Sequence, residues 1–157
     1  QTPTALILWR QDIPDLPAAS GNRYQEALGA ERGGYTVMDA AGAQVTLVAN
    51  GSEVALLCQT AELLDAAGVK ASVVSVPSIG LFMDQDEEYR NSVIPSDMPT
   101  FGLTAGLPST LREVVGANGY VYGLSRFGAS APYKVLDEKF GFTPQAVYEQ
   151  VLKFLGR

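Results

Sequence analysis

The side chain of this sequence best suited to hold a ligand is an arginine that follows an apolar segment. Residues 4–9, Thr-Ala-Leu-Ile-Leu-Trp, are bounded by Pro3 and lead directly into Arg10. A short apolar run of this kind predicts a buried strand. At the carboxyl end of a strand, a guanidinium group presents a planar, permanently charged fork that suits a phosphate. Solvation or pairing with a carboxylate is the commoner role of such an arginine, and both alternatives stay open on these residues alone.

The sequence contains no histidine. This excludes Ser-His-Asp and Cys-His nucleophile systems, His-based zinc sites and the usual proton shuttle at neutral pH. Any chemistry therefore depends on carboxylates, Lys, Arg, Tyr or backbone groups. The only cysteine, Cys58, can form no internal disulfide and falls in a helical pattern. We expect it to be a small buried apolar side chain in a reducing, cytoplasmic protein.

Two further segments invite a functional interpretation but have simpler structural ones. Gly51-Ser52-Glu53 follows an apolar run and could open a helix whose N-terminus binds an anion. The carboxylate of Glu53 would already occupy that position, so we expect plain capping. The acidic run over residues 84–88 lacks the glycine and the ligand spacing of a calcium loop. We expect it to be the solvated first turn of a helix, and we identify no metal-binding residue.

Composition limits the remaining function classes. The chain has 157 residues, 46% of them apolar, which suits one globular core. A net charge of −6 argues against a nucleic-acid partner. The apolar runs are far shorter than the roughly 20 residues of a membrane-spanning helix, so we expect no membrane partner. The sequence begins at Gln1 without a signal-peptide pattern, and we expect it to be a piece of a longer protein.

The elements that would position these residues alternate between strand and helix patterns. Residues 12–34 are rich in turn-forming residues, with one helical turn expected around 23–28. Ser52 and Thr143 are expected to be N-caps, with Pro144 at a first helical position. The alternation predicts an α/β fold with a mostly parallel sheet between helices. Strands are expected over 35–38, 45–49, 69–76, 100–104 and 120–124, and helices over 52–67, 84–93, 109–115, 131–140 and 144–155.

The loop at residues 126–132, Arg-Phe-Gly-Ala-Ser-Ala-Pro, separates the last expected strand from a helix. Its pattern predicts a tight turn fixed by Gly128, with Phe127 packed beneath it and Ser130 capping the helix.

Several of these motifs together resemble the C-terminal domain of a transketolase. They are Arg10-Gln11-Asp12, the Asn-Gly-Ser-Glu-Val of residues 50–54, the loop 127–132 and the Glu-Lys-Phe-Gly-Phe-Thr of residues 138–143. The resemblance covers nearly the whole chain. It implies a three-layer α/β/α domain with a mostly parallel sheet and one antiparallel strand. It further implies that residues 1–11 are the last strand of a preceding pyrimidine-binding domain, 12–34 a linker and 35–157 the C-terminal domain.

The resemblance also implies a function for the longer protein. Transketolases transfer a two-carbon ketol unit between sugar phosphates in the pentose phosphate pathway, using thiamine diphosphate and Mg²⁺ or Ca²⁺. Arg10-Gln11 matches the family motif whose arginine grips the sugar-phosphate tail, although Trp9 replaces the usual small hydroxyl residue. The motifs that hold cofactor and metal belong to the two preceding domains. The resemblance therefore implies that this chain has no catalytic, cofactor-binding or metal-binding residue, is inactive alone, and works with the preceding domains in a homodimer.

The sequence differs from the family pattern at two places, and two interpretations other than a transketolase domain stay open. Ser125 replaces an aspartate found in many relatives, and Leu103-Thr104-Ala105-Gly106 lacks the glutamate of a common Glu-Ala-Gly motif. A deoxyxylulose-phosphate synthase or the β subunit of a 2-oxo-acid dehydrogenase carries a similar terminal domain. A free-standing dimerisation or binding module is a third interpretation, because the family domain contributes subunit contacts and no catalytic group.

Overall fold

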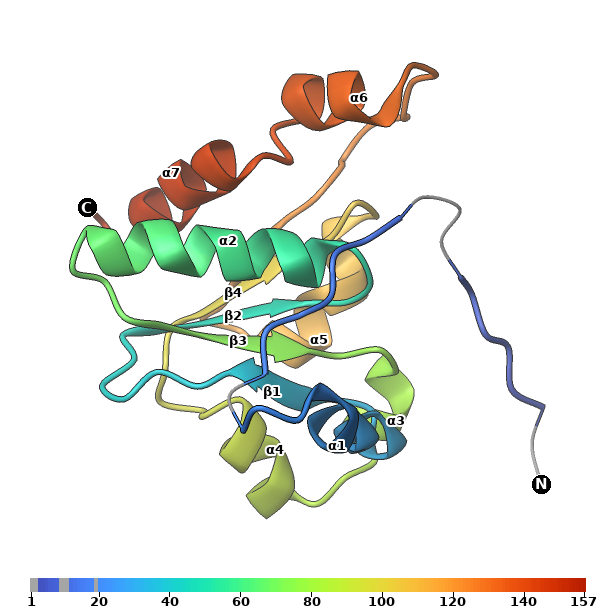
Figure 1. Cartoon of the computed structure of the whole chain (residues 1–157), viewed down its shortest axis with the longest axis vertical. Coiled ribbons are helices and arrows are strands. Elements are labelled where there is room, and N and C mark those ends of the chain that lie inside the picture. Colours follow the sequence, from blue (N-terminus) through green and yellow to red (C-terminus); the bar gives the residue numbers. More distant parts are fainter. Residues whose placement is uncertain (1–2, 9–11, 19) are drawn as a thin grey trace.

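The computed structural model describes residues 3–8, 12–18 and 20–157 (Figure 1). Its centre is a five-stranded sheet in the order β1-β3-β2-β4-β5. β1 runs antiparallel to β3, whereas the β2–β3, β2–β4 and β4–β5 pairs are parallel. The expected mixed sheet is therefore confirmed. The strands are β1 Tyr35–Met38, β2 Val45–Ala49, β3 Ala71–Ser75, β4 Thr100–Leu103 and β5 Tyr120–Tyr122.

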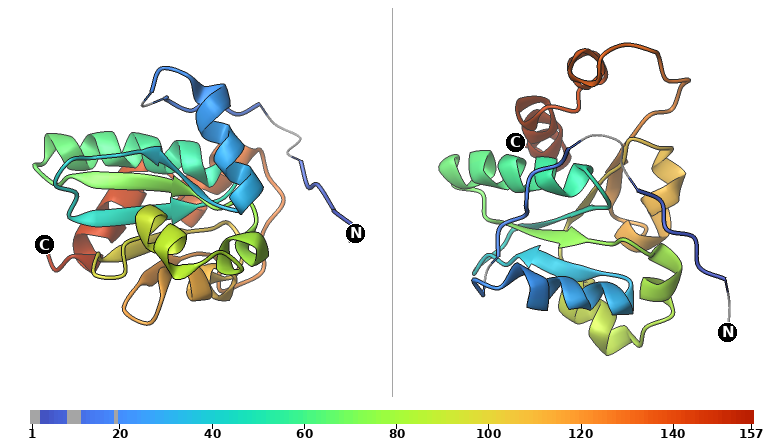
Figure 2. Two further views of the ribbon diagram at one scale, coloured as in Figure 1. Left: turned by 90° about the horizontal axis from the view of Figure 1, so that it is seen from below. Right: turned by 45° about the vertical axis from the view of Figure 1, so that its right-hand side comes forward.

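Helices cover both faces of this sheet (Figures 1 and 2). α2 and α7 lie on one face, and α3, α4 and α5 lie on the other. The three-layer α/β/α arrangement is thus confirmed. The helical elements are α1 Arg23–Ala27, η1 Leu28–Arg32, α2 Glu53–Ala66, α3 Ile79–Met83, α4 Glu87–Val93, η2 Pro108–Leu111, α5 Arg112–Val115, α6 Tyr133–Phe140 and α7 Pro144–Phe154. None of the described helices is both long and apolar enough to span a bilayer.

The central strands are apolar on both sides because each face of the sheet has its own core. Successive residues of a strand point to opposite faces. Leu47 and Val73 accordingly pack with α2 and α7, while their neighbours Val48 and Val74 pack with α3 and α4. Every residue of β2 is buried. This explains why the sequence shows continuous apolar runs here instead of alternation.

α2 and α7 have the local sequence signals that were expected of them. Every residue predicted to face the sheet from α2 is buried, including Leu57 and Cys58. At the start of α7, the amide of Ala146 donates a 3.3 Å hydrogen bond to the hydroxyl of Thr143. Ser52 occupies the N-cap position of α2, but its side chain makes no capping hydrogen bond. The expected position was therefore confirmed for both caps, and the expected contact only for Thr143.

Two expectations about helices on the other face were incomplete. α3 was not foreseen, because its five residues show no polar face and follow Pro77. α4 begins at Glu87, three residues later than expected, because Asp86 caps it. The amide of Tyr89 donates a 2.7 Å hydrogen bond to the Asp86 carboxylate. The acidic run is exposed apart from the half-buried Gln85, as expected of a solvated turn.

The strand expected at residues 4–9 does not form in the part of this segment that the structure describes. Residues 3–8 have no regular structure and are exposed, with Ile7 91% exposed. Figure 1 shows this segment running outside the body of the fold. The physical reason is that this segment pairs with no strand of the sheet. Trp9, Arg10 and Gln11 lie outside the described residues.

Candidate functional site

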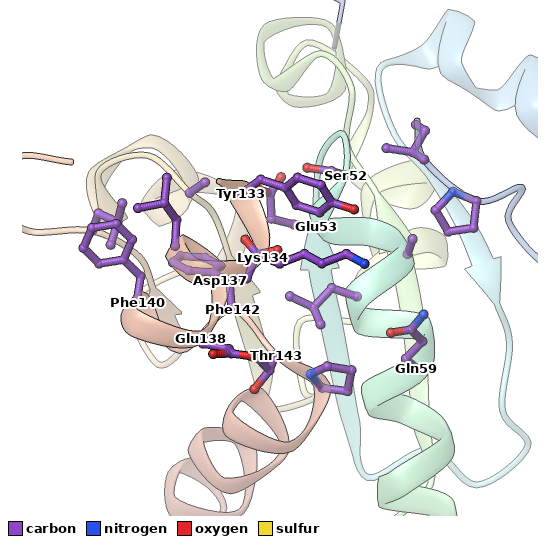
Figure 3. A pocket seen from close by; sticks show the side chains of 18 of the residues that line it. Ser52, Glu53, Gln59, Tyr133, Lys134, Asp137, Glu138, Phe140, Phe142 and Thr143 are labelled. Atoms are coloured by element: carbon purple, nitrogen blue, oxygen red, sulfur yellow. The ribbon is translucent and has the colours of Figure 1, made fainter. Parts of the chain in front are cut away.

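A large hollow in the described part of the chain lies where the parallel strands end. A cavity of about 650 Å³ is bounded by the first turns of α2, by α6 and by residues 12–14. Ser52, Ala105 and Leu124 line it just beyond the carboxyl ends of β2, β4 and β5. Open α/β sheets bind ligands in this kind of position. The cavity is therefore the candidate site (Figure 3).

Glu53 is the most deeply placed charged group of this cavity. It begins α2 and is only 7% exposed. Burial raises the pKa of its carboxyl group, and the nearby Asp137 raises it further, although hydrogen bonds from Ser52 and its own amide act in the opposite direction. Partial positive charge at the start of a helix also favours a carboxylate there. The net pKa shift is still upward, so the surroundings of Glu53 do not fully compensate its negative charge.

Asp137 and Lys134 come to the same cavity from α6. They are three residues apart, so they share one side of the helix. Burial also raises the pKa of Asp137. Figure 3 shows the Asp137 side chain beside Glu53, while the Lys134 amine extends across α2 away from both carboxyl groups. Two carboxyl groups from different helices thus line the same cavity.

α6 forms its wall of the cavity while burying none of its own residues. It is held at its C-terminal end, where the Tyr122 hydroxyl donates a 2.8 Å hydrogen bond to the Phe140 carbonyl. The rings of Tyr122 and Phe142 pack with centroids 5.6 Å apart. Gly141 closes the helix at φ 75°, a left-handed conformation that favours glycine. The guanidinium of Arg126 lies 4.8 Å above the Phe140 ring.

The expectations for the loop before α6 were wrong. Phe127 is 98% exposed and packs beneath nothing. Gly128 has no left-handed φ and open space around its Cα, so no tight turn requires it. α6 begins at Tyr133 with Pro132 in the N-cap position, so Ser130 does not cap it. Apart from the contact of Arg126 with the Phe140 ring, the loop is exposed, and its turn-like sequence does not impose a turn.

Cys58 and Arg10 were also singled out from the sequence, and Cys58 does not line this cavity. Cys58 is buried in the α2 core, and burial raises its thiol pKa to about 11. Arg10 lies outside the described residues, although Asp12, two positions later, lines the cavity. Asp137 and Lys134 were missed, because charged residues on a short helix look like a solvated face. Only the chain path through Gly141 to α7 brings them over α2.

The cavity does not fit the cofactor that the resemblance implies. Carboxylates of Asp12, Glu53, Asp137 and Glu138 line it against the single cation Lys134. A diphosphate would meet mainly negative charge there. Within residues 3–8, 12–18 and 20–157, no three His, Cys, Asp or Glu side chains are grouped closely enough to hold a metal ion.

Comparison with known proteins gives a consistent relationship. Residues 33–143 match the family model described as the transketolase-like TK C-terminal domain. Transketolase 1 of Escherichia coli is 42% identical over 156 residues, covering 98% of this chain and 23% of that protein. The transketolase of Halalkalibacterium halodurans is 43% identical over 148 residues, covering 92% of this chain and 22% of that protein.

Solved structures agree with the sequence comparison. The structure of a Pichia stipitis transketolase in complex with sedoheptulose 7-phosphate matches with a TM-score of 0.82 and 33% identity. The match covers 94% of this chain and 20% of that one. The chain thus spans less than a quarter of the length of these two curated relatives.

Proposed function

We propose that this chain, which belongs to the family of transketolase-like C-terminal domains, serves as the C-terminal domain of a transketolase. The longer enzyme would move a two-carbon ketol unit between sugar phosphates. The observation that carries the proposal is the match of 98% of this chain to 23% of a transketolase at 42% identity. Because nearly the whole chain matches one segment of a larger enzyme, the comparison favours a domain of such an enzyme over a free-standing module.

The proposal divides the chain into three parts. Residues 1–11 would be the last strand of the preceding domain, 12–34 the linker and 35–157 the C-terminal domain. The exposure of Leu6, Ile7 and Leu8 supports this division, because an apolar strand removed from its sheet has nothing to pack on. α1 and η1 begin inside the linker and lie beside β1, so the end of the linker would be anchored to the domain.

Catalysis would take place outside this chain. The preceding domains would hold thiamine diphosphate with a divalent metal, and the cofactor would supply the nucleophilic chemistry of the transfer. This chain would contribute Arg10, whose guanidinium would bind the substrate phosphate and orient the sugar. It would be inactive alone, and the intact enzyme would be a cytoplasmic homodimer. The single thiol of Cys58, buried and unpaired, supports the reducing compartment.

A chimera tests the proposal. Residues 1–157 would replace the aligned segment of Escherichia coli transketolase 1, with which they share 42% identity. The chimera should transfer ketol units, and Arg10→Ala should raise the KM for phosphorylated acceptors by roughly 10- to 100-fold, since charge-assisted hydrogen bonds contribute about 1.5–3 kcal/mol. Arg10→Lys keeps the positive charge but lacks the planar guanidinium group, so it should give a smaller increase in this KM. An equal increase in the KM for unphosphorylated acceptors would show that Arg10 does not bind the substrate phosphate.

A further inference from the structure

The cavity at the carboxyl ends of the strands contains negative charge that the described residues do not balance. The ion pairs of the described residues are Arg23–Glu26, Arg32–Asp86 and Lys70–Asp65. None includes a carboxyl group of the cavity. Yet Glu53 is 93% removed from solvent and lines the hollow beside Asp137. Buried carboxylates in proteins are normally paired with a cation.

The shape of the cavity suits a cation on an apolar stem. Glu53 and Asp137 line it together with apolar side chains from α2, the α6–α7 connection and the start of α7, namely Leu56, Phe142 and Pro144. Its volume of about 650 Å³ greatly exceeds that of one water molecule. Arginine and lysine combine an apolar stem with a charged head in this way. Lys134 does not fill this role, because its amine extends away from both carboxyl groups.

The place of the cavity indicates which polypeptide would supply the cation. Residues 12–14 form part of its rim, so the chain that precedes this domain enters beside the cavity. More than three quarters of the Escherichia coli and Halalkalibacterium halodurans transketolases lies outside the matched segment. The half-exposed Tyr133 lines the cavity from the first turn of α6, and the exposed Phe127 directly precedes Gly128 and Ala129, which also line it. A neighbouring domain seated here would cover both apolar rings and the carboxyl groups.

We propose that this cavity is a docking site for an arginine or lysine side chain of the preceding polypeptide, bound between the carboxylates of Glu53 and Asp137. The source of the cation rests on the proposed function, whereas the preference for a cation on an apolar stem does not. The contact would fix α6 against α2 when the domain is in place. It would also neutralise two carboxylates that have no ion-pair partner among the described residues.

The test on the 157-residue chain uses n-butylguanidinium as the probe and n-butylurea as its neutral isostere. Titration followed by amide NMR shifts in α2 and α6 should give saturable, millimolar binding of the cation and none of the urea, as expected for so small a ligand. Glu53→Gln should weaken the binding at least tenfold, and so should Asp137→Asn. Glu62→Gln, an exposed change on the same helix, should leave it unchanged. Absent binding, equal binding of both probes, or unchanged binding in Glu53→Gln and Asp137→Asn would overturn the inference.

The chimera distinguishes the source of the cation. If the preceding polypeptide fills the site, the probe should no longer bind in the chimera. An active chimera that binds the probe like the isolated chain would overturn the polypeptide source and leave the proposed function intact. An inactive chimera would count against the proposed function, whereas the probe experiment on the isolated chain would still decide the chemistry of the cavity.

Discussion

Tyr122 and Phe140 connect the sheet to the helix that covers the candidate site. The Tyr122 hydroxyl, at the end of β5, donates a 2.8 Å hydrogen bond to the carbonyl of Phe140, in the last turn of α6. α6 has no buried residue of its own. Its position over the cavity therefore depends on this bond and on the packing around Phe142.

Removal of the Tyr122 hydroxyl should loosen this wall of the cavity. Tyr122→Phe keeps the ring contact with Phe142 but leaves the Phe140 carbonyl without its donor. We expect a loss of about 0.5–1.5 kcal/mol in the free energy of unfolding. Amide hydrogen exchange should speed up in α6 more than in α2. Tyr148→Phe, on α7, is the control, and equal exchange in both variants would contradict the assigned role of Tyr122.

Two glycines near α6 should respond very differently to alanine. Gly141 has φ 75°, and a Cβ there would lie 2.5 Å from the Tyr122 hydroxyl. Gly128 has no left-handed φ and nothing within 4 Å. Gly141→Ala should therefore cost roughly 1–3 kcal/mol, whereas Gly128→Ala should change stability by less than about 0.5 kcal/mol. Thermal unfolding of the two variants measures the difference, and similar melting temperatures would show that Gly141 is not the constrained position.

Glu53 should make the isolated chain less stable as the pH rises. Burial holds its pKa above the ordinary value of 4.5, so the folded state binds its proton more tightly than the unfolded chain does. The stability this provides is complete below pH 4.5 and is lost as the pH rises through the raised pKa. Five further titratable side chains line the same cavity: Asp12, Tyr133, Lys134, Asp137 and Glu138. Burial also raises the pKa of the Asp137 carboxyl group.

Glu53→Gln tests this dependence on pH. The variant should melt about 2 °C or more above the wild type at pH 7, and the difference should shrink as the pH falls below 4.5. Glu62→Gln, on the exposed side of α2, is the control and should show no such trend. A Glu53→Gln variant that is less stable than the wild type at pH 7 would mean that the carboxylate is well paired in the isolated chain.

The N-terminal segment should contribute nothing to the stability of the isolated chain. Residues 3–8 are exposed and pair with no strand of the sheet, so a variant that starts at Asp12 should keep its melting temperature within about 1 °C. Amides from Ala5 to Leu8 should exchange at nearly unstructured rates. Strong protection of these amides that persists on dilution would show instead that the segment belongs to this domain.

The parts of the fold that could be predicted are those in which local sequence and tertiary packing agree. Leu57 and Cys58 could be placed because the period of α2 matches the sheet beneath it, and Thr143-Pro144 marks the start of α7 without any long-range information. Phe127 was misplaced, because a large apolar side chain suggests packing, whereas in the structure it is 98% exposed. The same holds for Ile7 in the N-terminal segment.

The candidate site was harder to predict than the fold. Glu53 was noticed as a cap, but its burial depends on α6, which is more than 75 residues away in the sequence. Asp137 has no neighbouring motif that marks it as part of a site. Its proximity to Glu53 follows from the path of the chain through Gly141, which is a tertiary feature. Periodicity and capping rules contain no information about such a pair.

The central claim is that this chain is a transketolase C-terminal domain that contains no part of the cofactor site. Calorimetric titration of the 157-residue chain with thiamine diphosphate and Mg²⁺ tests it most directly, with the chimera as the positive control. We expect no measurable heat of binding from the isolated chain and saturable binding by the chimera. Micromolar binding of thiamine diphosphate to the isolated chain would contradict the claim.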